Sequence, residues 1–235
     1  MRTANRPSGP FRERLYFEAP EIDDICRDAL KAAGCLPVTP KEIDVERFVE
    51  KHFRCECGFE DLPEGVMGFT AFDKKGKVVS IRVQSSLEDG SKTGIHRVRS
   101  TWSHEAGHGL LHAILFIEVP GSPTLFQCAD SNVSDNKILC RNFDIRPVGA
   151  RYDGRWWEWQ ANRCIGGLLL PRSLVRESLA ALIDTSPVTQ KPSLSAARRE
   201  QALEVVSSLF NVSAAVAKIR LEEIFPSDDS KQITF

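Results

Sequence analysis

The segment Ser103-His-Glu-Ala-Gly-His-Gly-Leu-Leu-His112 places three of the five histidines of the chain within nine residues. Residues four apart lie on one face of a helix, separated by about 6 Å along its axis, so His104 and His108 can reach one metal ion. Glu105 then lies beside the ion, where a carboxylate can take a proton from a bound water. The spacing predicts a helix over about 96–116 that carries a metal centre, rather than polar histidines that align by chance.

A second pair with the same spacing is formed by His108 and His112. His104 and His112 are about 12 Å apart along such a helix, too far to share one ion. Only the first pair has a glutamate directly after its first histidine, so we prefer His104 and His108 as ligands. His112 is then either a residue that contacts a ligand or the substrate, or a histidine packed in the core.

A hydrolytic zinc site needs a third protein ligand and leaves a fourth position open for water. Glu158 is a candidate, because it stands near the start of a helical stretch over about 156–170 and among three tryptophans. Asn162 lies one turn later on the same face, placed to hydrogen-bond a ligand. From spacing alone, Glu158 is interpreted equally well as a surface residue near a helix start, where the helix dipole favours an acidic side chain.

The composition is that of an ordinary globular protein: 235 residues, 42% hydrophobic and 27% charged, with a net charge of −1. This balance argues against a protein that coats nucleic acid or an anionic membrane. No apolar stretch is long enough to span a bilayer, and the first residues lack the apolar segment of a signal peptide. We therefore expect a cytoplasmic protein whose seven cysteines are reduced.

The order of elements predicts an α+β fold. A β-hairpin is expected over 66–72 and 78–84, with Val79, Ile81 and Val83 facing the core. Its second strand is either a plain structural strand or an edge strand that aligns an extended substrate. Helices are expected over about 20–33, from a capping box at 39–42, over 156–170, from there to about 183, and over 196–210 and 213–224.

The motif HEAGHGLLH followed by EWQANRCIGGLLLP resembles the ImmA/IrrE family of zinc metallopeptidases, and the similarity spans about residues 38–225. Members carry His-Glu-x-x-His on one helix and Glu-x-x-Ala-Asn on a later one. The resemblance implies that His104, His108 and Glu158 bind Zn²⁺ as in gluzincins, with Glu105 as the general base.

We accordingly expect a zincin-like metallopeptidase core over 19–185, with the β-hairpin or sheet packed on the metal-binding helix. A loop of about 120–155, rich in Gly, Ser, Asn and Asp, is expected to be inserted in this core and to border the cleft. Residues 1–18 are expected to form an irregular tail, and 186–235 a C-terminal helical appendage.

The resemblance further implies a peptidase that cleaves a protein partner, often a helix-turn-helix repressor or an antitoxin, and so acts in transcription regulation. Besides the metal, Tyr152 and His112 are the candidates for stabilising the oxyanion. The alternative is a zinc-containing regulatory protein of the same fold that binds a partner without cleaving it. Intact Glu105 favours the peptidase, because a binding module needs no base.

Three other features have simpler interpretations. His52-x-x-Cys55-x-Cys57 has poor spacing for a tetrahedral metal site, so its cysteines are expected in the core. Cys128 and Cys140 are expected to be a reduced structural pair, although either could bind the zinc as a fourth ligand and hold the enzyme latent. The helices over 200–224 mimic a helix-turn-helix but offer few basic residues, so direct nucleic-acid binding is not expected.

Overall fold

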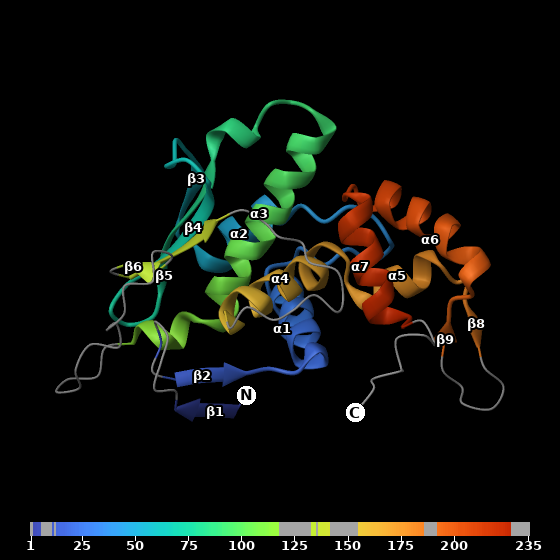
Figure 1. The fold of residues 1–235 in the computed structure, drawn as a ribbon, viewed down its shortest axis with the longest axis horizontal. Coiled ribbons are helices and arrows are strands. Elements are labelled where there is room, and N and C mark those ends of the chain that lie inside the picture. Colours follow the sequence, from blue (N-terminus) through green and yellow to red (C-terminus); the bar gives the residue numbers. More distant parts are fainter. Residues whose placement is uncertain are drawn as a thin grey trace.

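The computed structural model describes residues 2–5, 11, 13–117, 133–134, 136–141, 155–185 and 192–226. These ranges combine α-helices with a mixed β-sheet, as the sequence predicts (Figure 1). The helices are α1 (Ala19–Ala32), α2 (Val45–Phe53), α3 (Lys92–Leu111), α4 (Trp156–Leu169), α5 (Arg172–Ser178), α6 (Ala196–Leu209) and α7 (Ala214–Ile224), with 3₁₀ turns η1 (Ser85–Leu87) and η2 (Ala113–Phe116). No helix in these ranges is long and apolar enough to cross a membrane.

The central sheet has the strand order β3-β5-β4-β7-β6. Its strands are β3 (Glu56–Glu60), β4 (Val66–Phe72), β5 (Val78–Gln84), β6 (Val133–Ser134) and β7 (Lys137–Arg141). The predicted β4–β5 hairpin is present, and β3 runs parallel to β5 while the other pairs are antiparallel. Because β5 lies between two strands, it is a plain structural strand, and the alternative of an edge strand that aligns substrate is wrong.

A β-bulge changes which hydrophobic residues of β5 face the core. The pairing shifts from Ala71↔Ser80 to Phe72↔Val78, which leaves Val79 as the extra residue. Val79 is 41% exposed, whereas Val78, Ile81 and Val83 are buried. The expected strict alternation therefore fails at Val79, because a bulge turns one residue out of the ladder.

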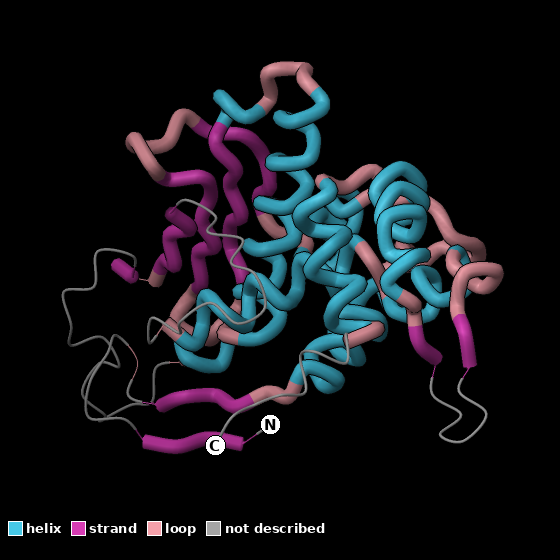
Figure 2. The backbone as a smooth tube through the Cα atoms, turned by 45° about the vertical axis from the view of Figure 1, so that its right-hand side comes forward, coloured by secondary structure: helices cyan, strands magenta, loops and turns pink. Residues whose placement is uncertain are grey.

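The helices lie on one side of the sheet, as Figure 2 shows. Helix α3 packs across β4 and β5, and α4 packs along α3 and is flanked by α1. One hydrophobic cluster extends through these layers from Phe11 to Phe225. The helices at the C-terminal end thus share a core with the sheet layer, and the division of the chain into core and appendage stays a prediction.

Two local expectations about the first half of the chain need correction. The stretch predicted as an irregular tail contains an antiparallel pair, β1 (Arg2–Asn5) and β2 (Glu13–Tyr16). The helix expected from residues 39–42 begins only at Val45, because the Asp44 side chain caps it by accepting from the Arg47 backbone.

A second short pair, β8 (Asp184–Thr185) with β9 (Pro192–Ser193), precedes α6.

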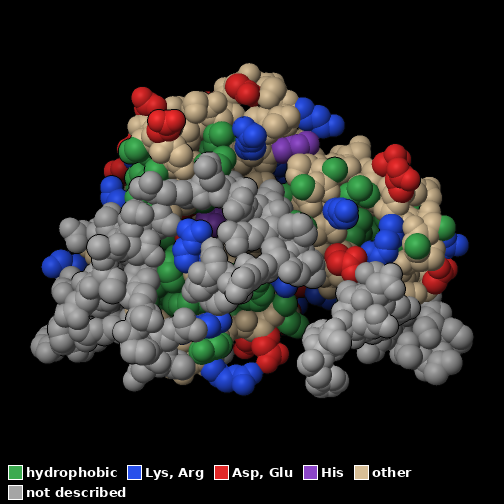
Figure 3. All heavy atoms as spheres, viewed as in Figure 1, with side chains coloured by type: hydrophobic (Ala, Val, Ile, Leu, Met, Phe, Trp, Pro, Cys, Tyr) green, Lys and Arg blue, Asp and Glu red, His purple; other side chains and the backbone are tan. Residues whose placement is uncertain are grey.

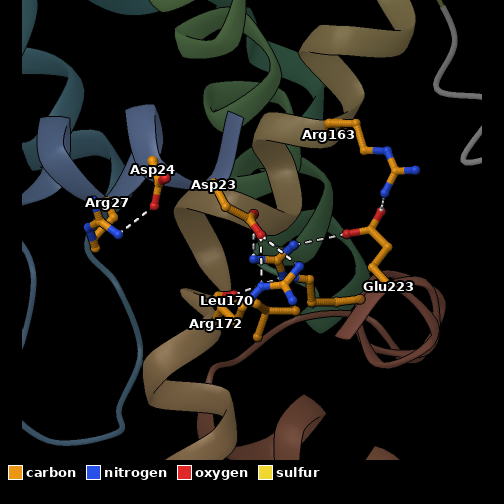
Figure 4. A network of polar contacts seen from close by, with 8 residues as sticks. Asp23, Asp24, Arg27, Arg163, Leu170, Arg172 and Glu223 are labelled. Atoms are coloured by element: carbon orange, nitrogen blue, oxygen red, sulfur yellow. Dashed lines mark hydrogen bonds and ion pairs between the residues drawn. The ribbon is translucent and has the colours of Figure 1, made fainter. Parts of the chain in front are cut away.

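A buried ion-pair network connects the C-terminal helix to the core (Figure 4). Arg220 of α7, which is 2% exposed, donates to Asp23 of α1 at 2.7 Å, to Glu223 at 2.9 Å and to the Leu170 carbonyl at 3.0 Å. Arg172 of α5 contacts the same Asp23 at 3.0 Å. These contacts hold α1, α5 and α7 around the end of α4, the helix that carries Glu158.

Replacing Arg220 with alanine is expected to lower the free energy of unfolding by about 3 kcal/mol. The largely buried Asp23 and Glu223 each lose one of their two cationic partners, and the Leu170 carbonyl loses its donor. Urea denaturation of both proteins measures this difference. Arg27→Ala is the control: Arg27 pairs with Asp24 and Asp28 on the exposed surface, and its loss should change stability little. Equal stability of Arg220→Ala and wild type would show that the network is not structural.

Candidate metal centre

Helix α3 brings the histidines into the interior. The Ser91 side chain caps its start by accepting from the Gly94 backbone, and almost every residue from 99 to 111 is buried. At Gly107 an added Cβ would lie 2.8 Å from Cys164 Cβ and 3.1 Å from Ala161 Cα. Glycine therefore allows α4 to approach α3 closely, and this approach carries Glu158 to the histidines.

The three predicted ligands converge on one point. The Nε2 atoms of His104 and His108 lie 3.0 Å apart. The carboxylate of Glu158 places one oxygen 3.2 Å from His104 Nε2 and the other 3.8 Å from His108 Nε2. Donors that each lie about 2.1 Å from a tetrahedral zinc are about 3.4 Å from one another, so the observed separations match a shared ion.

A chain of hydrogen bonds determines where His108 carries its proton. The Gln160 amide donates to the Leu15 carbonyl at 2.8 Å, so its oxygen faces His112 and accepts from His112 Nε2 at 3.0 Å. His112 Nδ1 is then a lone pair, which accepts from His108 Nδ1 at 3.0 Å. Neutral His108 is therefore protonated at Nδ1 and presents a lone pair at Nε2.

Asn162 orients His104 in the same way. Its Nδ1 lies 2.9 Å from Asn162 Oδ1, and an amide oxygen can only accept, so Nδ1 carries the proton. The Nε2 atoms of His104 and His108 thus face each other across 3.0 Å. With both rings neutral their lone pairs would repel at this distance, so the pair is stabilised by a cation between them, either a metal ion or a proton on His104. The arrangement therefore fits a metal ion.

The electrostatics agree with one cation in this position. Burial disfavours charge on His104, but Cys140 and Glu158 outweigh it and place the pKa of His104 well above its usual value. Burial and the charge of His104 together place the pKa of His108 well below its usual value. Burial lowers the pKa of His112 to about 4, so it stays neutral in the hydrogen-bond chain. Without metal, a single proton on His104 takes the cation's place.

Glu105 lies beside the three ligands and is completely buried. Thr70 of β4 donates to its Oε2 at 2.7 Å, while Oε1 has no hydrogen-bond partner among the described residues. A Cβ at Gly68 would lie 3.0 Å from Oε1, so glycine in β4 leaves space for the carboxylate. Burial raises the pKa of Glu105 to about 8. A nearby divalent cation would lower this pKa again, because it stabilises the carboxylate.

The structure tests several hypotheses about residues that surround the predicted ligands. His112 is packed in the interior and supports His108, and Asn162 supports His104. Tyr152 and Cys128 lie outside the described residues. Cys140 is 2% exposed, and its Sγ lies within 4.8 Å of a His104 nitrogen and a Glu105 oxygen.

Two supporting residues were not predicted from the sequence: Thr70 and Gln160. Gln160 stands between Glu158 and Asn162 in the same motif. Helical spacing alone does not tell whether its side chain hydrogen-bonds a histidine or only packs in the core. Thr70 is thirty-five residues from Glu105 in the chain, and its role depends on how α3 crosses β4. Strand alternation alone contains no signal for such a contact.

The other candidate sites do not bring metal donors together. Cys55 and Cys57 have their Sγ atoms 3.6 Å apart, but His52 stacks on Phe48. In the described part of the chain, the groups with metal-ligand spacing are the Glu158 group and a second one made of His104, Glu105 and Cys140. The paired thiols are half-buried and pack against the side of the core rather than inside it, so the expectation that they lie in the core is met only in part.

On the face shown in Figure 3, the described basic and acidic side chains are interspersed. They form no basic patch there that would favour nucleic-acid binding. Within the helix-turn-helix-like segment, Arg220 is buried in its ion-pair network and is not available to a phosphate. Only Lys218 remains as an exposed basic residue on α7.

No protein-family model matches this chain, and no curated protein sequence matches it. The interpretation of the site consequently depends on the motifs and on the geometry of α3, α4 and β4.

Asn162→Ala is expected to weaken zinc binding about 10- to 100-fold, because His104 loses the partner that sets its tautomer. Competition with a chromophoric chelator measures the affinity. Asn162→Asp is the matched control: a carboxylate can accept the same hydrogen bond, so it should retain most of the affinity. Equal affinities of the alanine variant and wild type would refute the role of Asn162.

Gly107→Ala is expected to destabilise the protein by about 1 to 3 kcal/mol, because the new methyl group forces α4 away from α3. The same displacement moves Glu158 from the histidines, so zinc affinity should fall as well. Gly58→Ala is the comparison, since its methyl group would meet only the end of the Arg82 side chain at 3.3 Å. Unchanged stability and affinity in Gly107→Ala would contradict the close-packing account.

Proposed function

We propose that this chain is a zinc-dependent peptidase with a zincin-like core, which hydrolyses a peptide bond in a protein partner. The observation that supports it most is the convergence of His104 Nε2 and His108 Nε2, 3.0 Å apart, with the Glu158 carboxylate beside them. Beside this group lies the buried Oε1 of Glu105, which has no hydrogen-bond partner in the part of the chain that the structure describes. The three ligands with an adjacent base form the donor set that hydrolytic zinc sites use.

In this proposal His104, His108 and Glu158 hold the ion. A zinc ion held by these residues would supply a Lewis acid for the scissile carbonyl and would lower the pKa of water to about 7. Glu105 takes the proton of the attacking water at Oε1, because Thr70 engages Oε2. The protonated Glu105 then delivers this proton to the departing amine nitrogen. Glu105 is fully shielded from bulk solvent, which strengthens each of these interactions.

The protein partner as substrate is supported by the ImmA/IrrE-like motifs, which suggest a helix-turn-helix repressor or an antitoxin. A large apolar side chain is available beside the centre: Trp159 is 41% exposed and follows Glu158 directly. Aromatic groups of this kind are common contacts in protein recognition. The described cysteines are free thiols, which is compatible with the cytoplasmic location that we propose. The same proposal includes neither a membrane nor direct nucleic-acid binding.

The alternative is a zinc protein that binds a partner without cleaving it. Glu105 argues for the peptidase, since a buried carboxylate with a partnerless oxygen costs stability. A binding module would be more stable with an uncharged residue at this position. Catalysis supplies a reason to retain the carboxylate.

Glu105→Gln separates the two functions. We expect wild type and variant to bind zinc alike, measured by elemental analysis, because Glu105 is not a ligand in this proposal. A mixture of unstructured peptides and a candidate repressor, analysed by mass spectrometry, should be cleaved by the wild type and at least about 100-fold more slowly by the variant. Wild-type protein that binds no metal would refute the proposal, and equal cleavage by both would refute the role of Glu105.

A further inference from the structure

Two cysteines meet where the chain passes from α2 into the sheet. Cys55 lies between α2 and β3, and Cys57 is the second residue of β3. In the parallel pairing of β3 with β5, Cys57 lies opposite Ile81, whose side chain is buried. The Sγ atoms of Cys55 and Cys57 are 3.6 Å apart, so the two thiols are in contact on one side of the chain.

This pair is more accessible than most of the described cysteines. Cys55 and Cys57 are half-buried, whereas Cys26, Cys140 and Cys164 are buried. Strand β3 ends the order of the central sheet, and its pairing with β5 begins at the residue after Cys55. A small solute can therefore reach the two sulfurs, and Cys55 lies outside the ladder that fixes the strand.

The two thiols differ in how readily they lose a proton. The hydrogen bond from the Cys57 thiol lowers the pKa of Cys55, and the positive charges of Arg82 and Lys77 act in the same direction while burial opposes them. The same hydrogen bond, together with burial, raises the pKa of Cys57. Cys57 Sγ also donates to the Cys55 carbonyl at 3.5 Å. Cys55 is thus the thiol that ionises, and Cys57 retains its proton.

A thiolate in contact with a second thiol is the arrangement found in cysteine pairs that react with oxidants. The thiolate reacts first, and the neighbouring thiol then closes a disulfide. A metal site explains the pair less well, because in the described part of the chain no third donor joins the two sulfurs in a group with metal-ligand spacing. The nearby His52 instead stacks on Phe48.

We propose that Cys55 and Cys57 form a reversible dithiol–disulfide site that reacts with peroxides. The Cys55 thiolate attacks one oxygen of hydrogen peroxide, so that an S–O bond forms, the O–O bond breaks and hydroxide leaves. Cys57 then attacks the oxidised sulfur of Cys55. An S–S bond forms, the S–O bond breaks, and the proton of Cys57 leaves with the hydroxyl group as water. The two thiols are oxidised by two electrons, and these electrons reduce the peroxide.

The reverse reaction needs a thiol reductant such as glutathione. Its thiolate attacks the disulfide, and a second glutathione releases the mixed disulfide, which restores both cysteines and leaves oxidised glutathione. A transient disulfide of this kind is compatible with a reducing compartment.

Mass spectrometry of the reduced full chain after treatment with hydrogen peroxide tests this proposal. Trypsin cleaves after Arg54 and Lys74, so the peptide of residues 55–74 contains both cysteines of the pair and no other cysteine. We expect this peptide to become lighter by two hydrogen atoms, and glutathione to restore its mass.

Variants assign the two roles. In Cys57→Ser the reaction should stop at the sulfenic acid of Cys55, which dimedone traps. In Cys55→Ser the same peptide should be oxidised at least about 10-fold more slowly, because the remaining thiol keeps its proton. Cys35→Ser is the matched control: Cys35 is also half-buried but bonds to the Ala33 carbonyl, so this variant should form the disulfide as the wild type does.

Three results would overturn the proposal. The first is a wild-type peptide that keeps its mass at a peroxide concentration that oxidises free cysteine in the same solution. The second is a peptide whose cysteines only gain oxygen, and the third is a disulfide from either residue to a different cysteine. The decisive measurement uses the wild type, so a variant that fails to fold does not obscure it. None of these readouts requires bound metal or peptide cleavage, so the proposal stands or falls separately from the peptidase function.

Discussion

The site depends on two imidazole nitrogens that face each other with lone pairs across 3.0 Å. When both rings are neutral these lone pairs repel, so either a metal ion or a proton on His104 is needed between them. Neither histidine can turn its ring without breaking a buried hydrogen bond. Asn162 orients His104, while Gln160, acting through His112, orients His108. These hydrogen bonds fix which ring nitrogens carry protons, and they leave the Nε2 atoms of both histidines directed at the candidate metal site.

The rest of the fold serves to keep this polar cluster buried. The Gln160 side chain ends on a carbonyl of β2, so the N-terminal strand pair is part of the support of the metal centre. Gly107 brings α4 against α3, and the Arg220 network holds the far end of α4. Thr70 and Gly68 place β4 against Glu105 on the other side. Each of these elements contacts α3 or α4, the two helices that carry the ligands.

The parts of this structure that sequence could predict are those set by local spacing. His104 and His108 follow from one helical turn, and the β4–β5 hairpin follows from alternation and its turn. The assignment of Glu158 as a ligand depended on a family resemblance, because tertiary packing determines how close this residue lies to α3. Strand β7 and its Cys140 depend on a register between distant segments, which no local pattern encodes. The bulge at Val79 likewise reflects pairing geometry, which the alternating sequence does not reveal.

The central claim is that this cluster binds a metal through His104, His108 and Glu158. The most direct measurement is anomalous diffraction at the zinc edge from crystals grown with zinc. The account predicts one strong peak in contact with Nε2 of both histidines and with the Glu158 carboxylate. An absent peak, or a peak only at another group such as Cys55 and Cys57, would contradict it.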